Sequence, residues 1–316
     1  MELCLNELSV TDGWLHASYE EIESAMNQFW DTICEFRRQI HGGRIVLRTK
    51  CGWKAILNTE TFQIQRWLHQ LEPDRRNVIL SVMDRSPYYA DAKDAGDQAL
   101  QMELRVGGDS SEGFLCAYLL DGIAVSFPPE DDRWKGAYVT GNLEQADDTG
   151  ELQYSQVYIR HMLSQVHVGE HAAYYNGIEY CKQQVATVQD LDEKKAHIFP
   201  HLIFSDTYDE SLKKTPMGQE RFGKIVERLH QLDEFMASGN HDVRSMGDCS
   251  PHESEPTMHK YGDLRKFLFA GESRICIPHM RLRDMNWRIH FFPSFETQIA
   301  YVGYIGRHLP TVNDPT

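Results

Sequence analysis

The sequence predicts an α+β protein built of two domains. Three observations lead to this class: a capped amphipathic helix near the start, short strand-like runs between residues 100 and 140, and, after residue 196, a strand, two helices and three or four strands. At 316 residues the chain is long enough for roughly two domains of ordinary size. Its 41% hydrophobic and 25% charged residues are typical of a globular protein.

The first predicted element is a helix that begins after Ser18. Ser18 and Glu21 match the capping box S-x-x-E, in which the two side chains bind each other's backbone amides. Apolar residues then recur at steps of three and four and form one stripe: Ile22, Met26, Phe29, Ile33, Phe36 and Ile40. We expect the helix to end at His41, because two glycines follow it.

The rest of the first domain is predicted as a mixture of helices and strands. A strand pair is expected at residues 44–48 and 53–57, and helices at residues 60–71 and 73–83. Further strands are expected at residues 100–106, 114–120, 123–127 and 137–140, with Asp121-Gly122 as a turn, and mostly helix at residues 154–188.

We place the domain boundary in the charged, weakly apolar stretch 188–195, which resembles a linker. The first domain is then residues 1–195 and the second is residues 196–316. The net charge of the chain is −15, but the last 60 residues hold eight Lys/Arg against five Asp/Glu, a net charge of +3. Residues 1–256 therefore carry a net charge of −18, and this asymmetry of charge suggests different partners for the two parts of the chain.

The second domain is predicted to begin with a short strand at residues 198–205. A helix pair follows at residues 209–214 and 219–236, then a long polar loop at residues 238–256. The chain ends in strands at residues 264–269, 274–281, 287–292 and 298–304. The last strands carry an unusual number of cations and histidines, which indicates either a solvated face or a surface for an anion.

The composition excludes several classes of protein. Seven scattered cysteines without a C-x-x-C pair argue against a disulfide framework and a zinc ribbon, and fit reduced thiols in the cytosol. No apolar run approaches the roughly 20 residues that span a bilayer, and the N-terminus lacks a basic signal-peptide region. We therefore expect a cytoplasmic protein that does not contact a membrane and needs neither a metal nor another cofactor.

The order of elements in the second domain resembles the RelE/ParE toxin family. Residues 202–214, LIFSDTYDESLKK, resemble the first strand and helix of that family, and residues 279–308, HMRLRDMNWRIHFFPSFETQIAYVGYIGRH, resemble its closing strands. The resemblance covers roughly the last third of the chain. The chain departs from the family in its acidic first domain, its mildly basic strands and its longer loop before them.

The resemblance implies a RelE-like domain made of a strand, a helical hairpin and an antiparallel sheet. It also implies metal-independent RNA cleavage, in which the 2′-hydroxyl attacks the adjacent phosphate with the help of proton-transfer groups and cations. Three residues match the family's pattern and would be catalytic: Arg288, His308 and His290. The residues that would bind RNA are His279, Arg281, Arg283 and Arg307. Period-two spacing places Arg281 with Arg283 on one strand face, and Arg288 with His290 on another.

Two other motifs have weaker signals. His167-Val-Gly-Glu-His171 fits the inverted zincin pattern H-x-x-E-H, although Gly169 weakens the helix that would place both histidines on one zinc ion. Asp190 or Asp192 with Glu193-Lys-Lys195 imitates a D…E-x-K nuclease motif, but this motif needs a strand, and a solvated charge run is the simpler interpretation.

Two hypotheses on function follow. In the first, the chain is a toxin-like RNA-cleaving effector, for example of a bacterial anti-phage defence system, and binds RNA or the ribosome through its second domain. In the second, it is a non-catalytic subunit of a multi-protein defence complex, with the sheet as a docking surface. In both, the acidic first domain has a regulatory or assembly role and binds protein partners.

Overall fold

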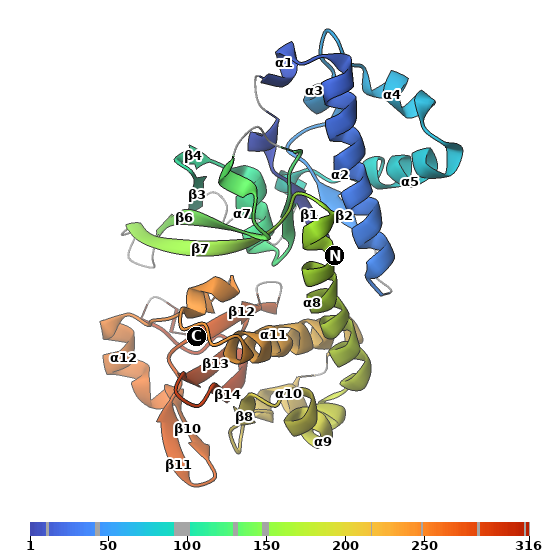
Figure 1. Cartoon of the computed structure of the whole chain (residues 1–316). Helices are drawn as coiled ribbons and strands as arrows, with labels where there is room; N and C mark the ends of the chain where they lie inside the picture. The colour runs from blue at the N-terminus through green and yellow to red at the C-terminus, as the bar shows by residue number, and fades with distance from the viewer. Residues whose placement is uncertain are drawn as a thin grey trace. The chain divides into compact units, whose positions relative to one another are not determined.

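The computed structural model divides into two compact units, Met1–Tyr175 and Asn176–Thr316 (Figure 1). The structure describes residues 1–10, 13–41, 45–91, 102–128, 132–146, 152–215, 217–247, 249–282, 285–312 and 314–315. Both units contain helices together with strands in mixed sheets, which confirms the predicted α+β class.

A seven-stranded sheet forms the centre of the first unit, in the order β2-β1-β5-β7-β6-β3-β4. The neighbouring pairs from β2 to β7 are parallel, and those from β7 to β4 are antiparallel. The strands are β1 (Glu2–Leu5), β2 (Val46–Arg48), β3 (Met102–Val106), β4 (Asp109–Ser110), β5 (Ile123–Val125), β6 (Tyr138–Ala146) and β7 (Leu152–Met162).

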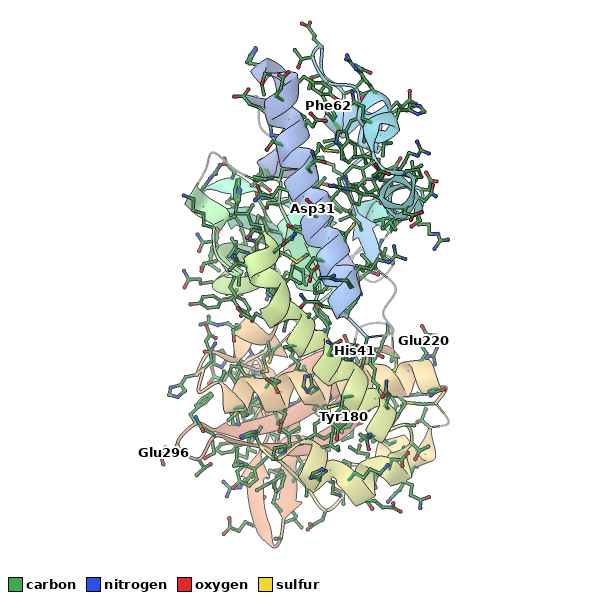
Figure 2. The ribbon with its side chains drawn as sticks, turned by 45° about the vertical axis from the view of Figure 1, so that its right-hand side comes forward. Asp31, His41, Phe62, Tyr180, Glu220 and Glu296 are labelled. Atoms are coloured by element: carbon green, nitrogen blue, oxygen red, sulfur yellow. The ribbon has the colours of Figure 1, made fainter. Side chains whose placement is uncertain are left out.

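Helices pack against part of this sheet. The capping box of α2 (Tyr19–Gln39) is present as predicted, since Ser18 and Glu21 bind each other's backbone amides. Figure 2 shows Asp31 on this helix, where it forms an ion pair with Arg75 at 2.9 Å, and Phe62, which is fully buried. The other helices of the unit are α1 (Gly13–His16), α3 (Trp53–Leu57), α4 (Ile64–Gln70), α5 (Pro73–Met83) and α7 (Glu112–Leu119).

Three predictions of secondary structure in this unit are wrong. Residues 53–57 form helix α3 rather than a strand, and β2 pairs in parallel with β1. Residues 114–120, predicted as a strand, belong mostly to α7, whose residues from Gly113 to Leu119 are all buried. A helix that is apolar on every side has no period that distinguishes it from a buried strand. Residues 154–162, predicted as mostly helix, belong to the long strand β7.

The boundary between the units lies 20 residues before the predicted one, within α8 (Gln165–Gln184). The stretch taken for a linker is instead α9 (Val188–Ile198), which begins at a capping box formed by Thr187 and Asp190. Its charges form ion pairs along the helix surface, such as Lys194 with Asp190 at 2.9 Å. Leu191 is fully buried and anchors the helix.

The second unit is built on a five-stranded sheet in the order β8-β14-β13-β12-β9. One face packs on α11 (Gln219–Ala237) through a core that includes Met280, Ile289, Val302 and Ile305. The strands are β8 (Leu202–Phe204), β9 (Cys249–Ser250), β12 (His279–Leu282), β13 (Trp287–Ser294) and β14 (Ile299–Arg307). The hairpin of β10 (Lys266–Phe269) and β11 (Glu272–Ile275) contacts the other face, where Phe267 stacks on Tyr304. Helices α10 (Glu210–Lys214) and α12 (Glu255–Tyr261) complete the unit.

Candidate functional site

The pairing of β12 with β13 brings four of the predicted site residues onto one sheet face. His279 lies directly opposite His290, and Arg281 lies directly opposite Arg288. Side chains of directly paired residues point to the same side of a sheet. Met280 and Ile289, which alternate with them, are buried on the opposite face against α11. We call the four residues, together with His308, the Arg/His cluster.

The two central histidines of the cluster lie inside the protein. His290 is fully buried and His279 is 6% exposed, and their ring centroids are 4.9 Å apart. Each Nδ1 lies 3.2 Å from a backbone carbonyl, that of Cys276 for His290 and that of Ile277 for His279. Because a carbonyl only accepts, each Nδ1 carries the proton and donates it.

Burial and the positive neighbours keep both rings neutral. Burial lowers the pKa of His290 to about 3, with a contribution from the positive charges of Arg265 and Arg288. It also lowers the pKa of His279 well below its usual value. The structure therefore does not support the predicted catalytic role of His290 or the predicted RNA contact of His279, because neither side chain can reach RNA in solvent.

A buried ion pair lies beside these rings. Arg265 is fully buried, and its Nε and Nη2 donate to Glu253 Oε1 at 2.9 and 2.7 Å. Its Nη1 and Nη2 also donate to the carbonyl of Pro310, each at 3.3 Å. The side chain of Glu253 is 8% exposed, and its Oε1 is 3.9 Å from His279 Nδ1. This pair ties the segment before α12 to the C-terminal residues.

Within the described residues, Glu253, His279 and His290 are the one group whose donor atoms could surround a metal ion, all within 4.8 Å of one another. The chemistry of the set does not fit a cation. The Glu253 carboxylate is already neutralised by Arg265. The charges of Arg281 and Arg288, which lower the pKa of His279, would repel a metal ion in the same way.

The accessible part of the cluster includes His308, which directly follows the last residue of β14. Its side chain is 17% exposed, and its Nδ1 lies 3.3 Å from Asp314 Oδ2, to which it donates. Burial, and next the positive charge of Arg288, lower the pKa of His308. A neutral imidazole held at Nδ1 by a carboxylate has its lone pair on Nε2, the arrangement of a general base. Arg281 and Arg288 are partly exposed on the same face.

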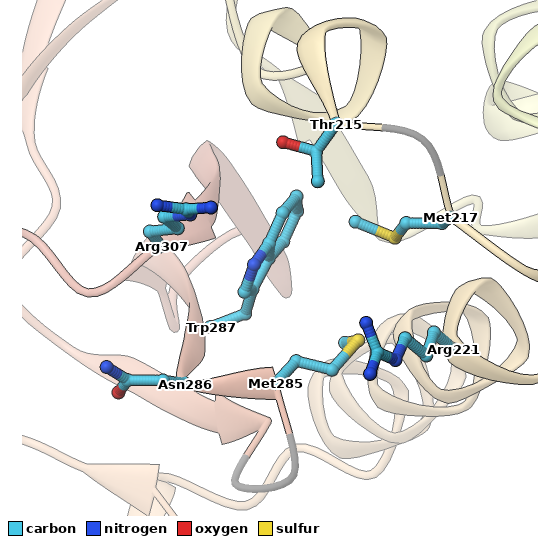
Figure 3. A pocket seen from close by; sticks show the side chains of 7 residues that line it. All are labelled: Thr215, Met217, Arg221, Met285, Asn286, Trp287 and Arg307. Atoms are coloured by element: carbon cyan, nitrogen blue, oxygen red, sulfur yellow. The ribbon is translucent and has the colours of Figure 1, made fainter.

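The structure separates Arg307 from this cluster. Arg307 pairs with Trp287, whose neighbour Arg288 points to the opposite face. Together with Arg221, it lines a pocket of about 270 Å³ beside Trp287, which we call the Trp287 pocket (Figure 3). Arg283 lies outside the described residues. The predicted RNA-binding residues therefore do not form one continuous set.

The side chains of the H-x-x-E-H and D…E-x-K patterns form structural contacts instead of a catalytic site. His171 is buried and its Nε2 binds the carbonyl of His161 at 2.9 Å, while His167 Nδ1 accepts from the amide of Leu163. The H-x-x-E-H motif therefore holds two structural histidines. The stretch that imitates a nuclease motif lies on helix α9, where Lys195 forms an ion pair with Asp192.

Sequence reasoning missed three residues that define these sites. Asp314 orients His308, Arg265 neutralises Glu253, and Arg221 faces the Trp287 pocket. Each of these contacts joins segments that lie on different elements, and a single sequence carries no signal for such a contact.

Comparison with protein-family models, curated proteins and solved structures finds no match to this chain. The resemblance to RelE/ParE toxins therefore stays a prediction. Within the described part of the chain, no helix combines the length and the apolar character needed to cross a bilayer.

Proposed function

We propose that the second unit binds RNA on the Arg/His cluster and cleaves it without a metal ion, as an effector in bacterial anti-phage defence. The observation that carries the proposal is the direct pairing of Arg281 with Arg288, on the sheet face where His308 is oriented by Asp314. Two neighbouring guanidinium groups match the oxygens of a phosphate, and a neutral histidine beside them can take a proton.

The mechanism assigns one role to each accessible residue. His308 Nε2 takes the proton of a ribose 2′-hydroxyl, and the 2′-oxygen then forms a bond to the adjacent phosphorus. The bond from phosphorus to the 5′-oxygen breaks, which leaves a 2′,3′-cyclic phosphate and a 5′-hydroxyl. Arg281 and Arg288 stabilise the negative charge on the phosphate oxygens. Because His290 is buried, the leaving oxygen takes its proton from water, and we expect slow turnover.

The experiment is a binding titration of a single-stranded RNA against the full chain at several salt concentrations. If each arginine contacts a phosphate, Arg281→Ala and Arg288→Ala should weaken binding and flatten the salt dependence by roughly 0.7 units of slope each. Arg38→Ala is the matched control, since Arg38 is 77% exposed on α2 in the first unit. Unchanged slopes in both cluster variants would contradict the proposal.

A second candidate function, as a protein-binding subunit of a defence complex, is supported by the first unit. One face of β6 and β7 exposes large side chains: Tyr138, Leu152, Tyr154 and Tyr158, with Tyr154 70% exposed. Residues 1–175 contain 15 Lys/Arg and 27 Asp/Glu, which gives a net charge of −12. Residues 176–316 contain 17 Lys/Arg and 20 Asp/Glu, which gives a net charge of −3. An acidic unit with exposed tyrosines suits a basic protein partner.

Pull-down from a bacterial lysate separates the two candidates. Under the second candidate, Tyr154→Ser with Tyr158→Ser should release a partner that Arg288→Ala retains, and no RNA should be cleaved. Under the first, RNA cleavage should survive the tyrosine changes. A partner that is retained by the tyrosine variant would remove the support for the second candidate.

A further inference from the structure

The Trp287 pocket has the chemistry of a binding site for an anion. Arg221 at the start of α11 and Arg307 at the end of β14 both line it (Figure 3). Among the described residues, neither guanidinium group has a hydrogen bond or an ion pair to another side chain, and no carboxylate lines the pocket. Two uncompensated guanidinium groups at one cavity favour a ligand with at least one negative charge.

The pocket also has an apolar wall. Trp287, Met217 and Met285 also line the pocket, and Figure 3 shows the ring of Trp287 between the two arginine side chains. Thioether side chains adapt to the shape of a flat ring and make favourable contacts with it. The hydroxyl of Thr215 and the amide of Asn286 add donors and acceptors that could bind the edge of such a ring.

Size limits the ligand to one small molecule. The volume of about 270 Å³ is just below the usual range for small-molecule sites, roughly 300–1,000 Å³. A ligand that joins one phosphate to one planar ring through a short polar link matches the volume, the paired cations and the apolar wall together.

We propose that the Trp287 pocket binds a nucleoside 5′-monophosphate. Arg221 and Arg307 attract the phosphate from either side of Trp287, and the base lies against Trp287, Met217 and Met285. This inference does not rest on RNA cleavage, because the pocket uses none of the residues of the Arg/His cluster. The same chemistry occurs in a free nucleotide and at a 5′-phosphorylated RNA end, so the experiment includes both sources.

The test is calorimetric titration of the full chain with AMP, GMP, CMP and UMP, and with a 5′-phosphorylated tetranucleotide RNA. We expect at least one of these to bind with a Kd of roughly 10 µM to 1 mM. Arg221→Ala and Arg307→Ala should each weaken that binding roughly tenfold or more. Tighter binding of the RNA assigns the pocket to an RNA end, and tighter binding of a nucleotide assigns it to a free ligand.

Controls separate the phosphate from the ring. The matching nucleoside and inorganic phosphate should each bind at least tenfold more weakly than the nucleotide, and Arg38→Ala should leave nucleotide binding unchanged. Both pocket arginines are exposed, so their replacement should leave the melting temperature unaltered, and Arg307→Lys provides a second variant that keeps the charge. Lack of binding by all five ligands at 5 mM, equal binding of inorganic phosphate, or wild-type affinity in both alanine variants would overturn the proposal.

Discussion

The imidazole ring of His290 is fully buried, and its burial makes the stability of the folded protein depend on pH. Its pKa is lowered to about 3 in the folded protein, from near 6.5 in an unfolded chain. At a pH between these two pKa values, His290 binds a proton in the unfolded state but not in the folded state. The free energy of unfolding therefore falls as the pH falls. The loss can reach about 1.4 kcal/mol per pH unit for one such histidine.

We therefore predict that thermal melts of the full chain shift to lower temperature from pH 7 to pH 4, and that His290→Asn reduces this shift. Asparagine keeps a donor near the Cys276 carbonyl but does not titrate. His69→Asn, at an exposed position, should show the wild-type shift. An identical pH dependence of the melting temperature in wild type and His290→Asn would show that His290 is not protected in this way.

Arg265 supports a second prediction at the level of single residues. Its replacement by methionine leaves the buried Glu253 carboxylate without its partner. We expect Arg265→Met to lower the free energy of unfolding by about 3–5 kcal/mol, the usual effect of removing one member of a buried pair. Urea denaturation measures this. The double variant Glu253→Leu/Arg265→Met should recover part of the loss, and a double variant as unstable as the sum of both single changes would contradict the interpretation.

At the level of elements, the β10–β11 hairpin packs on β14 through a glycine. A Cβ atom at Gly303 would overlap the ring of Phe267 and lie 2.7 Å from Cys276 Sγ. We predict that Gly303→Ala lowers the free energy of unfolding by about 1–3 kcal/mol, the usual cost of overpacking. Gly169→Ala is the matched control with the opposite sign. Nothing lies within 4 Å of its Cβ position in helix α8, so it should stabilise by roughly 1 kcal/mol.

The elements also show how far the sequence predicts this fold. The helix after Ser18 is predicted correctly because its cap and its apolar stripe agree. Helix α7 is predicted wrongly as a strand, because a helix buried on all sides shows no alternation of apolar and polar residues. Arg288, His290 and Arg281 are correctly expected on strands, but the register that pairs His279 with His290 depends on how the chain turns between β12 and β13. The burial of both histidines depends on segments from elsewhere in the chain, which strand patterns do not describe.

At the scale of the whole molecule, the chain joins a strongly acidic unit to one that is nearly neutral, with net charges of −12 and −3. An overall charge of −15 repels RNA at long range, so any RNA binding must come from local clusters of cations. Arg281 and Arg288 form such a local cluster, and we propose that this sheet face cleaves RNA with His308 as the base.

The most direct test is the rate of cleavage of a single-stranded RNA by the full chain under single-turnover conditions, in EDTA at pH 7. The account predicts a 2′,3′-cyclic phosphate product and a rate that falls roughly 10²–10⁴-fold in His308→Ala. It predicts no change in His69→Ala, whose histidine is exposed on α4. A wild-type protein that does not cleave RNA, or a His308→Ala variant that cleaves it at the wild-type rate, would contradict the account.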